Sequence, residues 1–287
     1  MVKAKRNERI AVITRILCEN PGKLFNLSYF SSLLGATKSS LSEDVSGLKE
    51  LFEARGLGRV ETLPGAAGGV RYIPVVSDEQ QEEYLSGLAL TLSDSRRALS
   101  GGYIYMADLM NNPEQLGCMA QALIRPFINK RADFILTIET KGIPIALMSA
   151  RALNLPLVVA RRENRINEGP LVTINYLSGS GKSMQTMSLP RRAAAAGQRA
   201  IIIDDFMKAG GSVKGLCDLM KEFGVSVEGI GVLVATKTPE RKLVDKYYSL
   251  LTLFSVDDYQ GIIDIRPTKR LRVCPCRLLP IGLRYPS

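Results

Sequence analysis

The chain has 287 residues, of which 46% are hydrophobic and 23% are charged, and its formal net charge is +10 at neutral pH. This composition is typical of a folded protein long enough for two domains, and it excludes a disordered chain. No stretch approaches the roughly 18 consecutive apolar residues that span a membrane, and the charged start MVKAKRNER precedes no apolar signal segment. We therefore expect a cytoplasmic protein with no membrane partner.

Histidine and cysteine usage narrows the chemistry. The chain contains no histidine, which excludes catalysis by Ser–His or Cys–His pairs and by any imidazole acid or base. Its five cysteines are scattered and odd in number, as is typical of reduced thiols. Cys274 and Cys276 form a CPC pair, but two thiols without a second pair or a histidine do not complete a tetrahedral zinc shell. We expect no resident metal.

Positive charge gathers at the two ends of the chain. Residues 1–74 hold 11 Lys/Arg against 7 Asp/Glu, residues 266–287 hold 6 basic and no acidic residues, and the segment between them is neutral. A polyanion is therefore expected to bind near the ends. The basic tail is either an arm that adds nonspecific DNA affinity or a variable terminus, and we favour the second.

Two short helices are predicted first. Apolar residues recur at spacings of three and four from Arg6 to Glu19, which predicts an amphipathic helix that the turn sequence NPGK ends. The segment LSYFSSLLG predicts a second helix, with Ser28 as its N-cap and Gly35 at its end.

A third, longer helix is predicted in ATKSSLSEDVSGLKELFEARG. Ser40 and Glu43 have the spacing of a capping box, although Thr37 is a rival start. Two helices, a tight turn and a longer helix follow one another in the order of a helix-turn-helix. After Gly56, two extended runs flank the glycine-rich PGAAGG and predict a hairpin, as in a winged helix.

The polar face of the third helix carries short donors and cations that suit phosphates and base edges. A small helical domain of any function can end in a hairpin, and an RNA-binding attenuator is a further alternative. We predict that residues 1–74 form a winged-helix domain whose partner is duplex DNA. The predicted contacts are Lys38, Ser39, Ser40 and Ser42 on the recognition helix, Arg71 on the wing, and Lys3, Lys5 and Arg6 at the amino end.

From Ser77 the pattern changes to helices that alternate with short apolar strands. ADFILTIE and LPLVVARR flank the helical segment GIPIALMSARALN, which predicts two parallel strands joined by a right-handed crossover. RAIIID, VEGIGVLVAT and LLTLFSV supply further strands. Residues 75–287 are therefore predicted to form an α/β domain, a parallel sheet with flanking helices. The tail from about residue 266 has no assigned fold within this domain.

The segment SGSGKS resembles the end of a Walker A loop. The full motif requires glycine at position 176, which is Tyr176, and the following MQTMSL alternates as a strand does and opens no helix. We predict instead the tip of a hairpin between two extended runs.

The segment AIIIDDFMKAGGSVKG carries the most informative chemical pattern. Its strand places Asp204 and Asp205 at the carboxyl edge of the sheet, where carboxylates accept hydrogen bonds from vicinal ribose hydroxyls. Gly210 and Gly211 open a helix whose N-terminal amides and dipole favour a phosphate, and Ser212 adds a hydroxyl donor. The pattern indicates a ribose 5-phosphate site, although an ordinary capped strand–helix junction shares the glycines and the serine.

This segment resembles the phosphoribosyl pyrophosphate (PRPP) signature of type I phosphoribosyltransferases. Together with PGAAGGVRYIP, GGYIYMADL, TKGIPIA and INYLSGSG, it makes the chain similar to the purine operon repressors of Gram-positive bacteria, to about residue 255. That family joins a winged helix to a type I phosphoribosyltransferase-like domain. The resemblance implies a homodimeric repressor of purine biosynthesis and salvage genes, with no catalytic residues.

The resemblance also implies an effector. PRPP, with Mg²⁺, would be the inducer that weakens operator binding, and guanosine tetraphosphate would compete for the same pocket. Asp204 and Asp205 would hold the ribose hydroxyls. The other implied PRPP contacts are Lys208, Ala209, Gly210, Gly211 and Ser212 at the 5′-phosphate, Thr140, Lys141 and Gly142 at the pyrophosphate, and Arg161, Arg162 and Tyr103 nearby.

An active purine phosphoribosyltransferase with a DNA-binding appendage is the alternative function. Nothing in DDFMKAGGS forbids transfer chemistry, because such transferases act largely by positioning and electrostatic stabilisation and need no histidine. We expect a regulator that is not an enzyme.

Overall fold

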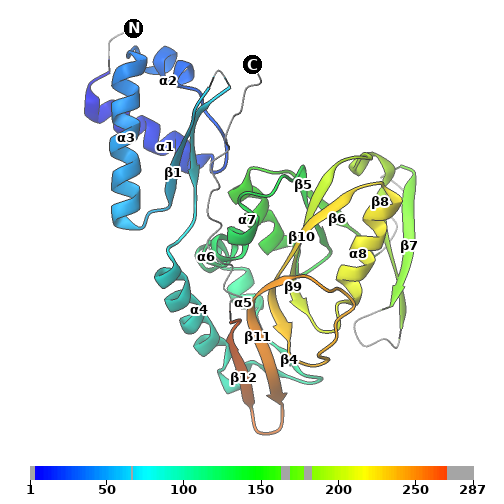
Figure 1. Cartoon of the computed structure of the whole chain (residues 1–287). Coiled ribbons are helices and arrows are strands. Elements are labelled where there is room, and N and C mark those ends of the chain that lie inside the picture. Colours follow the sequence, from blue (N-terminus) through cyan, green and yellow to red (C-terminus); the bar gives the residue numbers. More distant parts are fainter. Residues whose placement is uncertain (1–3, 66, 163–168, 178–182, 270–287) are drawn as a thin grey trace, which may run out of the picture.

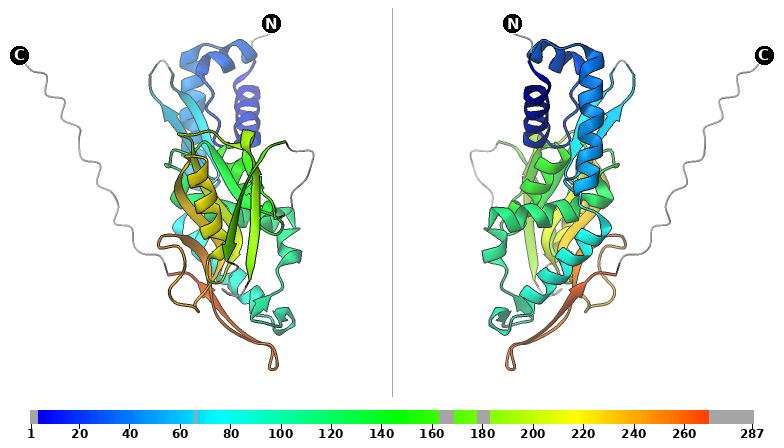
Figure 2. Two further views of the ribbon diagram at one scale, coloured as in Figure 1. Left: turned by 90° about the vertical axis from the view of Figure 1, so that its right-hand side faces the viewer. Right: turned by 90° about the vertical axis from the view of Figure 1, so that its left-hand side faces the viewer.

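The computed structural model describes residues 4–65, 67–162, 169–177 and 183–269. Lys3, most of the SGSGKS segment and the basic tail with its CPC pair lie outside these residues. The described chain forms a small helical part with a hairpin and a larger α/β part, and Figure 2 shows from two sides that the small part lies at one end of the large one. No helix within the described ranges is long and apolar enough to cross a bilayer.

The small part is a winged helix (Figure 1). Each helix buries one apolar stripe, and these stripes meet the hairpin in a single core that includes Ile13, Phe30, Leu41 and Val70. The spacing of the apolar residues therefore decides how the helices pack. The elements are α1 (Arg6–Glu19), α2 (Leu27–Leu34), α3 (Lys38–Arg55), β1 (Arg59–Leu63) and β2 (Gly69–Ile73).

One predicted helix start is wrong, and at another the rival start Thr37 is the correct one. The N-cap of α2 is Asn26, not Ser28, and its side-chain oxygen accepts a backbone N–H at 2.8 Å. The N-cap of α3 is Thr37, whose hydroxyl oxygen accepts the N–H of Ser40 at 3.3 Å. The predicted capping box from Ser40 to Glu43 is therefore wrong. In both cases an earlier cap residue with extended backbone angles satisfies the free amides, so the helix begins sooner.

A buried ion pair joins the first and third helices. The Nε atom of Arg9 lies 2.6 Å from Oδ2 of Asp44, and both side chains are almost fully buried. The hydrogen bond that the Arg9 guanidinium donates to this carboxylate raises the pKa of the guanidinium. Because each group would leave an uncompensated charge without the other, the pair holds α1 and α3 in one arrangement.

The large part is built on a sheet of six strands in the order β12-β11-β10-β9-β5-β6. All neighbours run parallel except β12, which pairs antiparallel with β11. The sequence analysis predicted a parallel sheet and did not include β12. The strands are β5 (Phe134–Ile138), β6 (Leu157–Ala160), β9 (Arg199–Met207), β10 (Ser226–Thr236), β11 (Tyr248–Asp257) and β12 (Ile262–Pro267).

Both faces of this sheet are covered (Figure 1). In β9, Ile201 and Ile203 pack into the cluster that contains α4, α6 and α7, whereas Ile202 packs into the cluster of α8 and the β7–β8 hairpin. Alternating residues of a central strand thus serve two cores, which explains its unbroken apolar run. The covering elements are α4 (Asp78–Leu92), α5 (Ala107–Met110), α6 (Pro113–Ile124), α7 (Ile143–Leu153), α8 (Gly211–Glu222), β3 (Ala98–Leu99), β4 (Tyr103–Ile104), β7 (Leu171–Leu177) and β8 (Met184–Pro190).

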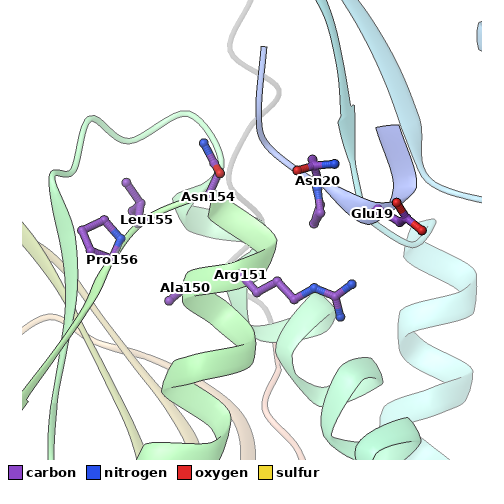
Figure 3. Close-up of a pocket in the computed structure, with 8 residues that line it drawn as sticks. Glu19, Asn20, Ala150, Arg151, Asn154, Leu155 and Pro156 are labelled. Atoms are coloured by element: carbon purple, nitrogen blue, oxygen red, sulfur yellow. The ribbon is translucent and has the colours of Figure 1, made fainter. Parts of the chain in front are cut away.

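The two parts meet where the turn after α1 approaches the end of α7. Gly22 in this turn has φ +77°, and a Cβ added there would lie 2.9 Å from the carbonyl carbon of Leu153. A cavity of about 290 Å³ lies beside this contact. Figure 3 shows Arg151 extending from α7 below Glu19 and Asn20 of the turn.

Candidate functional site

The acid pair lies within β9 and not just beyond its end. The strand continues to Met207, so Asp204 keeps a partner, Val232, in the register with β10. The N–H of Asp205 donates to Oδ1 of Asp204 at 3.0 Å. Burial, followed by the charge of Asp205, raises the pKa of Asp204 well above its usual value, and burial also raises the pKa of Asp205. Both carboxyl groups are thus poised to accept a proton, a cation or hydroxyl donors.

The loop after β5 reaches this pair because it carries glycine at position 142. A Cβ on Gly142 would lie 2.5 Å from Oδ1 of Asp204 and 2.6 Å from Oγ1 of Thr137. The hydroxyl of Thr137 is buried and has no hydrogen-bond partner among the described residues. Sequence reasoning missed this threonine, because a polar residue inside the run FILTI is also typical of an ordinary strand.

Thr140 and Lys141 complete this loop before α7 begins. The peptide bond between Glu139 and Thr140 is cis. The positive charge of Lys141 acts to lower the pKa of Asp205, against the larger effect of burial. The lysine and the acid pair therefore belong to one electrostatic site.

The two arginines after β6 lie beside this loop, and both contact its first residue, Glu139. Glu139 accepts the backbone N–H of Arg162 at 2.7 Å, and its other oxygen lies 4.0 Å from the guanidinium of Arg161. The charge of Arg162 also acts to lower the pKa of Asp204. Glu139 thus orients this segment and directs its carboxylate toward the arginines, a role that sequence reasoning did not assign.

The glycine-rich turn follows the acid pair directly. Gly210 has φ +85° and is the N-cap of α8, so the backbone reverses there into the helix start at Gly211. The first N–H groups of a helix have no intrahelical acceptor, and the positive end of the helix dipole lies among them. This turn can therefore bind an anion.

Tyr103 is brought to this turn from a distant segment. The Nζ atom of Lys208 lies 5.3 Å from the centre of the Tyr103 ring and donates to the carbonyl oxygen of Gly101 at 3.2 Å. The same ring lies 5.6 Å from that of Phe206. The structure thus gathers the acid pair, the loops 140–142 and 208–212, and Tyr103 near the carboxyl ends of β5 and β9, the edge at which open parallel sheets form a ligand crevice.

The proposed DNA contacts on α3 lie at its amino end. Lys38, Ser39 and Ser42 are exposed and Ser40 is half-buried. The hydroxyl oxygens of Ser39 and Ser40 each lie 3.0 Å from that of Thr37. These side chains form one small polar surface over the first turn of the helix, where the dipole also favours phosphate.

The other proposed DNA contacts are less free to meet a polyanion. Arg71 donates to Glu61 at 2.7 Å and lines a cavity of about 280 Å³ together with basic residues of the α/β part. Arg6 lies 3.4 Å from Asp44. Lys5 is the N-cap of α1 and is exposed to solvent, whereas Lys3 lies outside the described residues.

Comparisons with known proteins match both parts of the chain. Residues 5–74 match the family model described as bacterial purine repressor, N-terminal, and residues 109–266 match the phosphoribosyl transferase domain. The purine biosynthesis transcriptional repressor PurR of Bacillus subtilis (strain 168) is 41% identical over 98% of this chain and 99% of its own length. The chain belongs to the PurR family.

Two further relatives differ in the share of this chain that they cover. The purine biosynthesis transcriptional activator PurR of Lactococcus lactis subsp. lactis is 37% identical over 91% of this chain and 97% of its own length. A xanthine phosphoribosyltransferase of Levilactobacillus brevis is 31% identical but covers 57% of this chain and 88% of its own length. As a PurR family member, the chain is a transcriptional regulator with an N-terminal DNA-binding domain. The expectation of a regulator and not an enzyme is confirmed by these nearly full-length relatives.

Proposed function

We propose that this protein represses purine biosynthesis and salvage genes and that PRPP, bound in the crevice, is the inducer that releases it from DNA. Repression as the direction of control follows the relative that is 41% identical over 98% of the chain and is named a repressor. The relative named an activator is 37% identical, so the direction needs its own test.

The single observation that supports PRPP is the arrangement of the crevice. A buried and a half-buried carboxyl group lie near the end of β9, and a cationic loop and an amide-lined helix start follow the carboxyl ends of β5 and β9, which are neighbours in the sheet. Vicinal hydroxyls of a ribose suit the carboxylates, the 5′-phosphate suits the helix start, and the pyrophosphate suits the loop with Lys141. These three chemical groups occur together in PRPP.

Magnesium fits the donor set of this crevice. Mg²⁺ prefers oxygen ligands and keeps several waters, and it is commonly held by one or two carboxylates together with substrate phosphates. Asp204 and Asp205 are the carboxylates available here, and a cation beside them would favour their ionised forms, which burial disfavours. The ion would balance part of the charge of PRPP.

Release from DNA requires a difference in affinity. PRPP lowers DNA affinity only if it binds the DNA-incompetent state more tightly, and DNA then weakens PRPP binding by the same factor. A homodimer is part of the proposal, because a two-fold protein presents two recognition helices to half-sites one helical turn apart. Guanosine tetraphosphate, which also carries phosphates on a ribose, is proposed to compete for the same crevice.

A gel shift with a purine-operon control region tests the proposal. We expect tight binding that PRPP with Mg²⁺ reverses and that guanosine tetraphosphate restores. The variant Asp204→Ala/Asp205→Ala should bind the same DNA but resist release by PRPP. Binding that PRPP leaves unchanged in the wild-type protein would contradict the inducer, and sedimentation as a monomer would contradict the dimer.

A further inference from the structure

A buried lysine lies behind the phosphate-binding turn. Lys242 belongs to the segment that connects β10 with β11, and only 9% of its surface is exposed. Its Nζ atom donates to the carbonyl oxygen of Thr236 at 2.7 Å, to the hydroxyl of Thr236 at 3.1 Å, and to the carbonyl oxygen of Lys208. All three protons of the ammonium group are therefore used.

The same segment holds the next carbonyl of the turn. The backbone N–H of Leu243 donates to the carbonyl oxygen of Ala209 at 2.9 Å. The hydroxyl of Thr236 lies 3.2 Å from the Lys208 oxygen and 2.7 Å from the carbonyl oxygen of Thr238. Two successive carbonyls of the turn are thus anchored on the side of residues 236–243.

Anchoring these carbonyls sets the direction of the amides. In a planar trans peptide the C=O and the following N–H point in opposite directions. When the oxygen of Lys208 is held by Lys242, the N–H of Ala209 must point to the other side. The bond from Leu243 to Ala209 does the same for the N–H of Gly210. The turn is therefore organised to present its amides to an anion before the anion arrives.

The charge of Lys242 is not cancelled by a carboxylate. None of the ion pairs between described residues includes it, and its three acceptors are neutral oxygens. Burial, followed by the charge of Lys237, lowers the pKa of its ammonium group, so the charged form is disfavoured at this position. A buried cation without an acid partner adds positive potential to the turn from behind.

We propose that Lys242 is a positioning residue for the 5′-phosphate of the effector, which it does not touch. It holds the Lys208 carbonyl of the phosphate-binding turn away from the ligand and leaves the N–H of Ala209 facing it. The inference rests on the proposed function, since it assigns a device to the same crevice. It concerns only the phosphate end of the crevice, because the loop 140–142 makes no bond with Lys242 among the described contacts.

Calorimetry of the full chain with two separate probes tests this role. Lys242→Met removes the ammonium group at similar length, and we expect its affinity for ribose 5-phosphate to fall about tenfold to a hundredfold, as for the loss of charge-assisted hydrogen bonds. Its affinity for pyrophosphate, which suits the loop with Lys141, should remain that of the wild-type protein. The matched control is Lys246→Met, the same change at an exposed lysine of the same segment.

Each outcome of this calorimetry either supports or overturns the positioning role of Lys242. Equal ribose 5-phosphate affinity in wild-type and Lys242→Met proteins overturns the inference, and so does an equal loss for both probes, which indicates general damage. If the wild-type protein binds neither PRPP nor ribose 5-phosphate, the proposed function itself fails.

A second pair of variants covers the case in which Lys242→Met does not fold. Thr236→Val removes the hydroxyl at the same volume, and Thr236→Ser retains it. We expect a smaller selective loss of ribose 5-phosphate affinity in Thr236→Val and wild-type affinity in Thr236→Ser. No difference between these two variants would also count against the inference.

Discussion

The winged helix and the proposed effector crevice are both expected to bind anions, but they are built from different parts of the chain. On the winged helix, exposed side chains such as Lys38 and Ser39 stand on a helix whose own core is separate from them. In the crevice, the groups proposed to meet the effector are backbone amides, the buried Asp204 and the half-buried Asp205, and they depend on neighbours such as Gly142. Replacing one exposed side chain of the winged helix should remove one contact. In the crevice, replacing any residue that orients the backbone should change the ligand-facing amides.

The largest effect is expected from the core of the winged helix. Leu41 is fully buried, and Leu41→Ala should cost about 2–5 kcal/mol of the free energy of unfolding of this part. DNA binding should be lost while the crevice still binds PRPP, because the two cores are separate clusters. Circular dichroism melting and calorimetry check this. Leu51→Ala, at an exposed position of the same helix, is the control and should change neither.

A methyl group at position 142 should affect the crevice alone. The added carbon of Gly142→Ala would meet the oxygens of Asp204 and Thr137 at less than van der Waals distance. We expect PRPP affinity to fall about tenfold to a hundredfold, the equivalent of a typical overpacking cost, with DNA affinity unchanged. Gly87→Ala places the same methyl group in open space and should behave as wild type. A loss of DNA affinity in Gly142→Ala would show that the two regions are not separable.

The acid pair should make the ligand-free protein less stable as the pH rises. A carboxyl group whose pKa is raised on folding binds its proton more tightly in the folded state, so stability is full in acid and is lost as pH passes the raised pKa. Asp204→Asn mimics the protonated group and should melt at a higher temperature than wild type at pH 7. The gain should be about 1.4 kcal/mol for every unit by which the pKa is raised. Equal melting temperatures at pH 7 would contradict the raised pKa, and the difference should vanish below the usual value near 3.8.

The smallest effect is expected from a single exposed lysine. If Lys38 contacts one phosphate, Lys38→Ala should reduce the dependence of log affinity on log salt by about 1 and weaken all sequences alike. Lys246→Ala, on the α/β part, should leave the slope unchanged. A slope that Lys38→Ala does not change would remove this residue from the DNA surface.

Much of the fold follows from patterns that are local in the sequence. The apolar spacing of α1, α2 and α3, the alternation of strands and helices after Ser77, and the acids before the glycine turn all predicted elements that the structure contains. The N-cap of α2 and the edge strand β12 were not predicted. A cap depends on where the chain leaves the preceding turn, and an edge strand depends on a partner strand, so neither is decided by its own residues.

The residues of the candidate site also divide into those that the sequence predicted and those that only the tertiary structure brought together. By itself the sequence determined the residue types of the phosphate turn and of the acid pair, because a helix start with glycines and a strand with two adjacent acids are continuous segments. Only the tertiary structure decided that Thr137 and Gly142 meet Asp204, that Glu139 holds the arginines, and that Lys242 is buried behind the turn. In KTPERKLVD this lysine resembles any solvated charge. Its burial and its three acceptors exist only once β9, β10 and the connecting segment have packed together.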